Sequence, residues 1–180
     1  MWLYLKEKTN FLNSNLKVLH IAPEHCFIKR FEAMKNLDYI TADIESPLAK
    51  VKMDVHKIPF SENTFDVAFC NHVMEHVEDD IKAMSEIRRV LKPGGWAIIQ
   101  SPMDPFRKIT FEDPSLITPQ QREAAHGQDD HVRTYGDDYP QRLRKAGFIV
   151  KEDRYVMELD KEKVKKYALP IEEIIYLCTK

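Results

Sequence analysis

Short apolar runs alternate along the chain with longer stretches in which apolar residues recur every three or four positions. Short apolar runs bounded by polar residues are typical of buried strands, and the wider spacing is typical of amphipathic helices. On this basis strands are expected at residues 17–22, 37–43, 51–54, 65–70, 96–101, 148–157 and 174–179. Helices are expected between them, at residues 24–35, 78–91 and 137–146.

This alternation predicts an α/β fold with a doubly wound, mostly parallel sheet and helices on both faces. The last two expected strands are close together in the chain, so we expect the final strand, 174–179, to be antiparallel and inserted at the edge of the sheet. Residues 1–16 are expected to form a helical lead-in. Residues 102–136 are too long for a simple connection, and such segments are often functional, so we expect them to line a substrate site. The whole of residues 1–180 is interpreted as one domain.

Composition narrows the classes of function. The chain has 180 residues and a formal net charge of −2, which argues against a broad basic surface for nucleic acid. No apolar run approaches the length of a membrane span, and the first residues lack a secretory pattern, so a cytoplasmic protein without membrane contact is expected. Cys26, Cys70 and Cys178 are far apart and form no CxxC pair, as expected for free thiols in a reducing compartment.

The candidates for chemistry follow the expected strands, because ligands of doubly wound sheets bind beyond the carboxyl ends of the strands. The first strand runs into "VLHIAPEH", Val18–His25, which has no glycine where a nucleotide-binding protein has a glycine-rich turn. Asp43 follows the second strand, 21 positions after Ala22, near the spacing of a carboxylate that binds ribose hydroxyls. Asp54 follows the third strand and can accept from the exocyclic amine of adenine. Either aspartate can instead stabilise a turn.

Several segments, taken together, resemble class I S-adenosylmethionine-dependent methyltransferases, most closely the type 11 group. They are "KVLHIAPE", "YITADIE", "MDVHKIPFSENTFDVAFCNHVMEHVEDD", "AMSEIRRVLKPGGWAIIQSP" and "LRKAGFIV". The middle block is the most specific, because "DxxxIPFxxxxFD", "EHVxD" and "RxLKPGG" follow one another in order. The resemblance implies a Rossmann-like sheet of seven strands with an antiparallel last strand, S-adenosyl-L-methionine as cofactor, and methyl transfer as the activity.

The resemblance also implies roles for particular residues. It assigns the ribose contact to Asp43 and the adenine contact to Asp54, and it places Asn71 and His72 beside the sulfonium and the substrate. Further contacts with the cofactor are expected from His20, Ala22, Pro23, Glu24, Ile44 and Val55.

The first turn departs from the family pattern, which has an acid and then alternating glycines at the positions of His20, Ala22, Glu24 and Cys26. Glycine there permits positive φ and close approach of the backbone to a ligand. We expect Pro23 to begin the helix directly and the Glu24 carboxylate to meet the ammonium of the cofactor. The alternative is that Glu24 only complements the positive end of the helix. The first turn lacks the glycines that bind a phosphate group. Their absence is compatible with S-adenosylmethionine, which has no phosphate, and argues against a nicotinamide dinucleotide, whose pyrophosphate needs such a turn.

A base is needed only if the methyl acceptor must lose a proton, and His72 and His131 are the candidates. The stretch "HGQDDHVRTYG" is rich in groups that can orient a polar substrate, and the alternative is a solvated surface loop or a helix cap. Substrate contacts are expected from Asp130, His131, Arg133 and Tyr135, with His126 and Asp129 beside them. The spacing of His and Asp fits no established metal-ligand pattern, so no metal is expected, and His20 and His76 are interpreted as structural or close to the cofactor.

The function expected from these features is methylation of a small-molecule acceptor. A homodimer is one way to cover the substrate cleft, since few residues precede the first strand. The alternative function is that of a degenerate methyltransferase fold that binds a ligand or a partner without catalysis, and the glycine-free first turn is its support.

Overall fold

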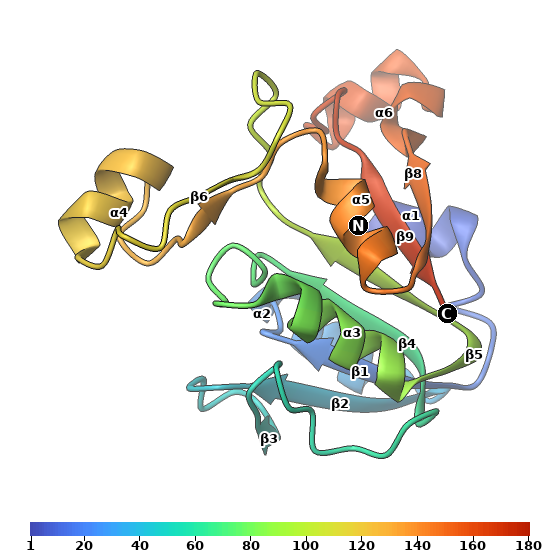
Figure 1. The fold of residues 1–180 in the computed structure, drawn as a ribbon. Helices are drawn as coiled ribbons and strands as arrows, with labels where there is room; N and C mark the ends of the chain where they lie inside the picture. The colour runs from blue at the N-terminus through green and yellow to red at the C-terminus, as the bar shows by residue number, and fades with distance from the viewer.

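The computed structural model describes residues 1–180 and centres on a seven-stranded sheet (Figure 1). The strands lie in the order β3 (Val51–Lys52), β2 (Leu37–Asp43), β1 (Leu16–Ile21), β4 (Phe65–Asn71), β5 (Leu91–Gln100), β9 (Ile175–Thr179) and β8 (Ile149–Asp153). Neighbouring strands are parallel, except that β9 is antiparallel to β5 and β8. The predicted fold class is confirmed. The last strand was predicted at the edge of the sheet, and this position was wrong. Strand β9 lies between β5 and β8, and β8 forms the edge.

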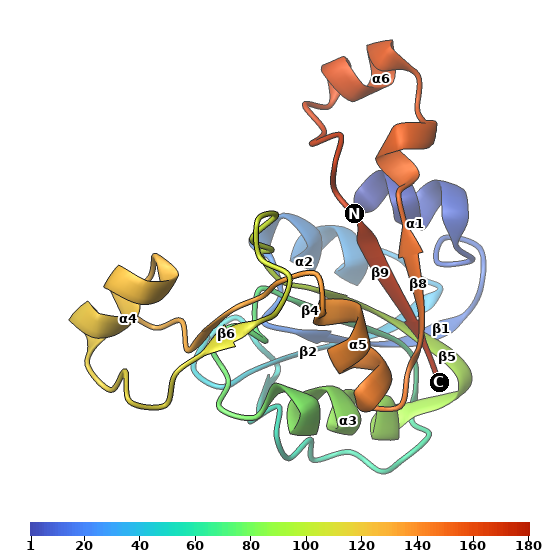
Figure 2. The same ribbon diagram turned by 45° about the horizontal axis from the view of Figure 1, so that its top comes forward.

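Helices cover both faces of this sheet (Figures 1 and 2). They are α1 (Trp2–Lys8), α2 (His25–Glu32), α3 (Asp80–Val90) and α5 (Tyr139–Lys145). Helix α6 (Lys161–Lys166) follows a 3-10 turn at Tyr155–Glu158 and lies beyond the end of β8 (Figure 2). Successive strand residues face opposite sides, so Val18 packs in the aromatic-rich core under α1 and α2, and Leu19 packs in the larger core under α3 and α5. No helix combines the length and the apolar character needed to cross a bilayer.

The chain leaves β1 through a residue in the left-handed region of backbone space. Ala22 has φ 47°, and its N–H donates to the carbonyl of Ala42 at 2.9 Å. Such a φ is favourable for glycine and costs a residue with a Cβ about 1 kcal/mol. The turn therefore has a glycine-type backbone without a glycine. Helix α2 begins at His25 with Glu24 as its N-cap, two residues later than the start expected at Pro23.

Residues 102–136 form an arm. Strands β6 (Phe111–Glu112) and β7 (Arg133–Thr134) pair at its base, and α4 (Pro119–His126) lies at its far end, away from the sheet in both ribbon views (Figures 1 and 2). Helix α4 begins with a capping box between Thr118 and Gln121 and ends at Gly127, which has φ 83°. None of its residues is buried, so it has no apolar periodicity that could have predicted it.

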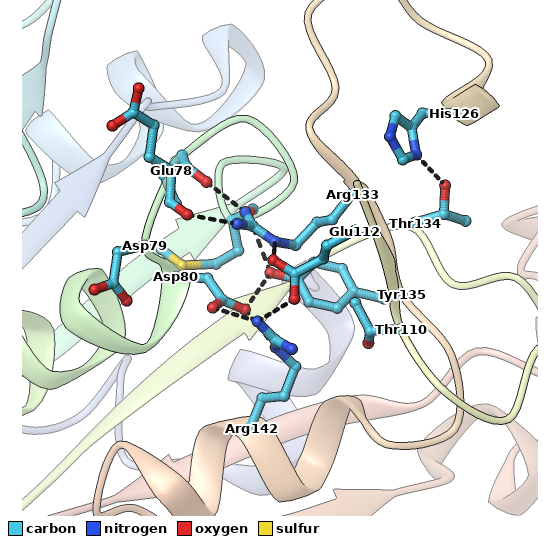
Figure 3. Close-up of polar contacts among 12 residues, drawn as sticks. Glu78, Asp79, Asp80, Thr110, Glu112, His126, Arg133, Thr134, Tyr135 and Arg142 are labelled. Carbon is cyan, nitrogen blue, oxygen red and sulfur yellow. Dashed lines mark hydrogen bonds and ion pairs between the residues drawn. The ribbon is translucent and has the colours of Figure 1, made fainter. Parts of the chain in front are cut away.

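A buried network of ion pairs ties the arm to α3 and α5 (Figure 3). Asp80 is 1% exposed, and Arg142 donates to both of its carboxylate oxygens at 2.7 Å. The Tyr135 hydroxyl donates to Asp80 at 2.8 Å. Glu112 of β6 pairs with Arg142 at 2.7 Å and with Arg133 at 3.1 Å. Both strands of the arm are therefore fastened to the helices.

Arg133 also connects the arm to the loop after β4. Its guanidinium donates to the carbonyls of Met74, Val77 and Glu78, the last at 2.9 Å. Arginine can hold several acceptors at once because its donors form a rigid planar fork. Arg133 thus fixes the loop after β4 against the base of the arm. This loop carries "EHVED", near the end of the middle block of family motifs.

The first prediction concerns the stability of this network. Asp80→Asn keeps the size of the side chain but leaves Arg142 without its buried counter-charge, so we expect the free energy of unfolding to fall by about 3 kcal/mol. The matched control is Glu152→Gln, which breaks the exposed pair with Arg144 and should cost less than about 1 kcal/mol. Urea denaturation measures both, and equal losses would contradict the role given to Asp80.

The second prediction concerns acid. Burial opposes ionisation of Asp80, but hydrogen bonding from Arg142 and the charge of Arg133 outweigh it and hold the pKa below its usual value of 3.8. Because the folded-state pKa is depressed, the stabilisation is present above about pH 4 and is lost as the pH falls through the lower folded-state value. Asp80→Asn should therefore show a shallower loss of stability below about pH 4 than the unmutated protein. A pH series of urea denaturation curves tests this, and parallel curves would contradict it.

The third prediction concerns the glycine-free turn. Ala22→Gly removes the strain of a Cβ-bearing residue at positive φ, but it also adds flexibility to the unfolded chain. We therefore expect the free energy of unfolding to stay level or to rise by up to about 1 kcal/mol. The control is Ala33→Gly at the exposed end of α2, where φ is −76° and the same change should destabilise by about 0.5–1 kcal/mol. Losses of the same size at both positions, measured in urea, would show that Ala22 is not strained.

Candidate functional site

Polar side chains at the ends of β1 and β4 converge on one carboxylate. Glu24 Oε2 lies 2.5 Å from His20 Nε2, and Glu24 Oε1 accepts from the Asn71 amide at 2.7 Å. His20 is fully buried, and its Nδ1 lies 2.8 Å from the Tyr39 hydroxyl. With the Nε2 proton donated to Glu24, Nδ1 accepts from Tyr39, so each polar atom of the ring has a partner. This chain of hydrogen bonds holds the Glu24 carboxylate in one position.

The charge of Glu24 is stabilised where it lies. Burial raises the pKa of this carboxyl, but the hydrogen bonds from His20 and Asn71 outweigh burial, and the net effect is a lowered pKa. The side chain makes no capping hydrogen bond to α2, so its hydrogen bonds go to side chains at the strand ends rather than to the helix. Contact of Glu24 with the ammonium of a cofactor stays a prediction.

A small cavity beside Glu24 has an anionic lining. Its volume is about 120 Å³, and it is lined by Met1, Glu24, Asn71, His72, Ile98, Gln100, Glu173 and Ile175. Two of these side chains are carboxylates, and none is lysine or arginine. The Asn71 Oδ1 atom is buried there without a hydrogen-bond donor. These acceptors therefore suit a cationic group with N–H donors, as the ammonium of S-adenosylmethionine is, and do not suit a pyrophosphate.

His72 extends this site towards the arm. It has φ 55° at the end of β4, and its N–H donates to the Gln100 carbonyl at 2.8 Å. Its side chain is 65% exposed, with Nδ1 at 3.6 Å from Glu75 Oε1. The nearby Glu75 carboxylate raises the pKa of His72. The imidazole thus borders the Glu24 cavity and approaches the segment that contacts the arm.

The two aspartates after β2 and β3 each stabilise a turn with one oxygen. Asp43 Oδ1 accepts from the N–H groups of Glu45 and Ser46 at 2.8 and 2.7 Å. Asp54 Oδ1 accepts from the N–H of His56 at 2.8 Å and from its ring at 2.7 Å, and these bonds, the backbone one first, lower the pKa of Asp54. The turn-stabilising alternative is therefore confirmed for both residues. The Oδ2 atoms accept no hydrogen bond from the protein, and ligand contacts by these atoms stay a prediction.

The other predicted cofactor residues differ in how much surface they offer. Ile44 has an exposed side chain next to Asp43, and Ala22 and Pro23 form the turn in front of Glu24. Val55 is buried and packs in the larger core, so its side chain is not accessible and only its backbone can meet a ligand.

The arm brings His131 to the loop after β4. The N–H of Val132 donates to the Glu75 carbonyl at 2.9 Å, and the His131 ring packs edge-on against the His76 ring with centroids 4.7 Å apart. His131 and Glu75 line a cavity of about 430 Å³, which His126 also borders. The walls of this cavity come from the arm and, through Glu75, from the loop after β4. That residues 102–136 line a substrate site stays a prediction.

The remaining substrate candidates lie in different surroundings. Arg133 and Tyr135 are buried, and their polar groups are engaged by the ion-pair network, which gives both a structural role. Asp130 is exposed, with Oδ2 at 3.1 Å from His76 Nδ1, and Asp129 is exposed. Substrate contact by any of these residues stays a prediction, and it is weakest for Arg133 and Tyr135.

Glu75 is the site residue that sequence reasoning missed. It is 2% exposed and accepts from the Ser101 hydroxyl at 3.0 Å. The "EHVxD" motif contained it, but only as a mark of family, because nothing local indicated that its side chain points inward to meet a residue of the arm.

Comparison with known proteins supports the same family for the segment that carries most of the site. Residues 17–99 match the family model described as a methyltransferase domain. A ubiquinone/menaquinone biosynthesis C-methyltransferase from Desulfotalea psychrophila is 33% identical over 58 residues, 32% of this chain and 24% of that protein. A tRNA U34 carboxymethyltransferase from Nautilia profundicola is 35% identical over 79 residues, 44% of this chain and 24% of that protein. The chain thus matches about a quarter of the length of these relatives.

A solved structure extends the likeness over the whole chain. The 1,6-didemethyltoxoflavin-N1-methyltransferase of Burkholderia thailandensis, with 1,6-didemethyltoxoflavin and S-adenosylhomocysteine bound, has a TM-score of 0.59 over 93% of this chain and 71% of that one. The identity is 15%, so this likeness bears on the fold alone. The matched residues 17–99 run from β1 to β5 and include Glu24, Asp43 and Asn71. Residues 17–99 therefore match the methyltransferase domain family, and the chain has the fold of class I S-adenosylmethionine-dependent methyltransferases.

Proposed function

We propose that this protein transfers a methyl group from S-adenosylmethionine to a small-molecule acceptor. The observation that carries the proposal is the Glu24 carboxylate, held ionised by His20 and Asn71 in a cavity without a lysine or arginine side chain. A carboxylate with a lowered pKa is the partner that an ammonium group requires. Glu24 would thus supply the charge that the family places one turn earlier, at the position of His20.

The rest of the cofactor would lie along the ends of β2 and β3. The free Oδ2 of Asp43 is the acceptor for the ribose hydroxyls, and that of Asp54 is the acceptor for the adenine amine, beside the exposed side chain of Ile44. Asn71 Oδ1, buried without a donor, is a second acceptor for the ammonium. S-adenosylmethionine brings a methyl group already activated on a sulfonium, so the main tasks of the protein are alignment and exclusion of water.

The acceptor would bind in the cavity between the arm and the loop after β4. Its volume of about 430 Å³ falls within the range of small-molecule sites, about 300–1,000 Å³. Asp104, Arg107 and His126 are among its lining residues, so a polar acceptor suits it. The names of the relatives include acceptors as different as quinones and a tRNA nucleoside, and the cavity volume favours a small molecule here.

His72 is the better placed of the two predicted bases. Its side chain is largely exposed and borders the Glu24 cavity, whereas His131 is 7% exposed and packs against His76. If the acceptor is a hydroxyl, His72 would take its proton. An acceptor that loses no proton on methylation needs no base.

The prediction from this proposal concerns cofactor affinity. Asp43→Asn keeps Oδ1 for the turn and removes the charge, and Glu24→Gln keeps the shape of the side chain and removes its charge. Each should raise the Kd for S-adenosylhomocysteine about 10- to 100-fold, because a hydrogen bond to a charged group is lost. The control is Asp38→Asn, at the opposite, exposed end of β2, which should leave the Kd unchanged. Calorimetric titration measures all four proteins, and unchanged affinity in both site variants would refute the proposed cofactor site.

Incubating the protein with methyl-labelled S-adenosylmethionine and pools of polar metabolites tests the reaction itself. Label in a small molecule supports the proposed acceptor class. Tight cofactor binding without label transfer to any pool would favour the alternative of a binding protein with a methyltransferase fold.

A further inference from the structure

Three potential metal ligands meet where the arm touches the loop after β4. Glu75 and His76 come from the loop, and His131 comes from the arm. One ligand atom of each lies within 4.8 Å of the other two, and Glu75 Oε1 is 4.0 Å from His76 Nε2. Two of the three side chains are buried, and Glu75 and His131 line the 430 Å³ cavity. We propose that Glu75, His76 and His131 bind a divalent transition-metal ion at this wall of the cavity.

The first argument is that the Glu75 carboxylate is only half satisfied. Its Oε2 accepts from the Ser101 hydroxyl at 3.0 Å, whereas Oε1 has only longer contacts with imidazole nitrogens. The nearest nitrogen atoms, His72 Nδ1 and His76 Nε2, are 3.6 and 4.0 Å away. Glu75 is 2% exposed and has no lysine or arginine partner, so a cation at this position would compensate its charge.

The second argument is that the ligands are already oriented by other side chains. His76 presents Nε2 towards Glu75, while its Nδ1 lies 3.1 Å from Asp130 Oδ2. Metal-binding histidines usually donate their other ring N–H to a carboxylate in this way, and ligating carboxylates are themselves hydrogen-bonded, as Glu75 is by Ser101. The hydrogen bond from Val132 N–H to the Glu75 carbonyl, 2.9 Å long, fixes the arm next to the loop.

The ligand types indicate the class of ion. Two imidazoles and one carboxylate suit zinc and the neighbouring divalent metals, and suit magnesium or calcium less well. With metal–ligand distances near 2.1 Å, tetrahedral ligands lie about 3.4 Å apart, so small side-chain rotations would close the present spacing. Three protein ligands leave a coordination position for water or for a molecule in the cavity.

This inference revises the expectation that the chain has no metal site. That expectation considered only the spacing within "HGQDDHVRTYG", whereas two of the ligands come from "EHVED" in the loop after β4. Binding of the ion does not depend on the methyl transfer proposed above, and it is measured without cofactor or acceptor.

The test uses the full chain, stripped of metal with a chelator and titrated with Co²⁺ and with Zn²⁺. We expect one equivalent of Co²⁺ to bind with visible absorption bands of a nitrogen- and oxygen-ligated ion, and Zn²⁺ to displace it and raise the Tm. His76→Ala, in the least buried ligand, and Glu75→Gln should each weaken binding at least about tenfold. Asp130→Asn should weaken it less, because Asp130 only orients His76.

The matched control is His25→Ala, an exposed histidine at the start of α2 that should leave the Co²⁺ titration unchanged. Circular dichroism identifies any variant that fails to fold, and His76→Ala, at a half-exposed position, keeps the test valid if Glu75→Gln unfolds. The proposal is overturned if the unmutated protein binds less than one equivalent, or if folded His76→Ala binds Co²⁺ as tightly as the unmutated protein.

Discussion

The buried carboxylate of Asp80 is the point on which the arrangement of this molecule depends. It sits in the first turn of α3 and holds Arg142 from α5 and Tyr135 from the arm. Glu112 then joins Arg142 to Arg133, and Arg133 reaches the carbonyls of the loop after β4. A buried charge of this kind is tolerated only with all its partners in place, so the arm, two helices and the loop hold one relative position.

That position decides where the chemistry can occur. Arg133 lies two residues after His131, so fixing the one guanidinium against the loop also sets the imidazole beside Glu75 and His76. The cavity between arm and loop exists because of the same contacts. The polar groups of Arg133 and Tyr135, both expected to bind substrate, are thus engaged in holding the arm in place, although Arg133 also lines the cavity together with His131 and Thr134.

The cofactor side depends on a different constraint, the backbone of the turn after β1. Ala22 adopts a positive φ without being glycine, and the turn brings Glu24 to His20 of β1 and Asn71 of β4. His20 and Asn71 orient the Glu24 carboxylate from the ends of β1 and β4. In a turn without glycine, a negative charge is therefore held near the ends of these two strands.

The architecture could be predicted from the sequence because it is encoded locally. Alternating and 3.6-residue periodicities, read over a few residues each, predicted all seven strands of the main sheet and the helices beside them. Spacing singled out Asp43 as a candidate site residue, the family resemblance Asn71, and the departure of the first turn from the family pattern Glu24. The length of residues 102–136 marked them as a separate segment, but the elements within this arm were not predicted, since α4 buries no residue and β6 and β7 have two residues each. The pairing of Asp80 with Arg142, 62 positions apart, and the meeting of Glu75 with His131 were decided only by the tertiary structure. Charged residues look alike in a sequence whether they face water or each other, and only packing determines which of them lose water and must find a partner.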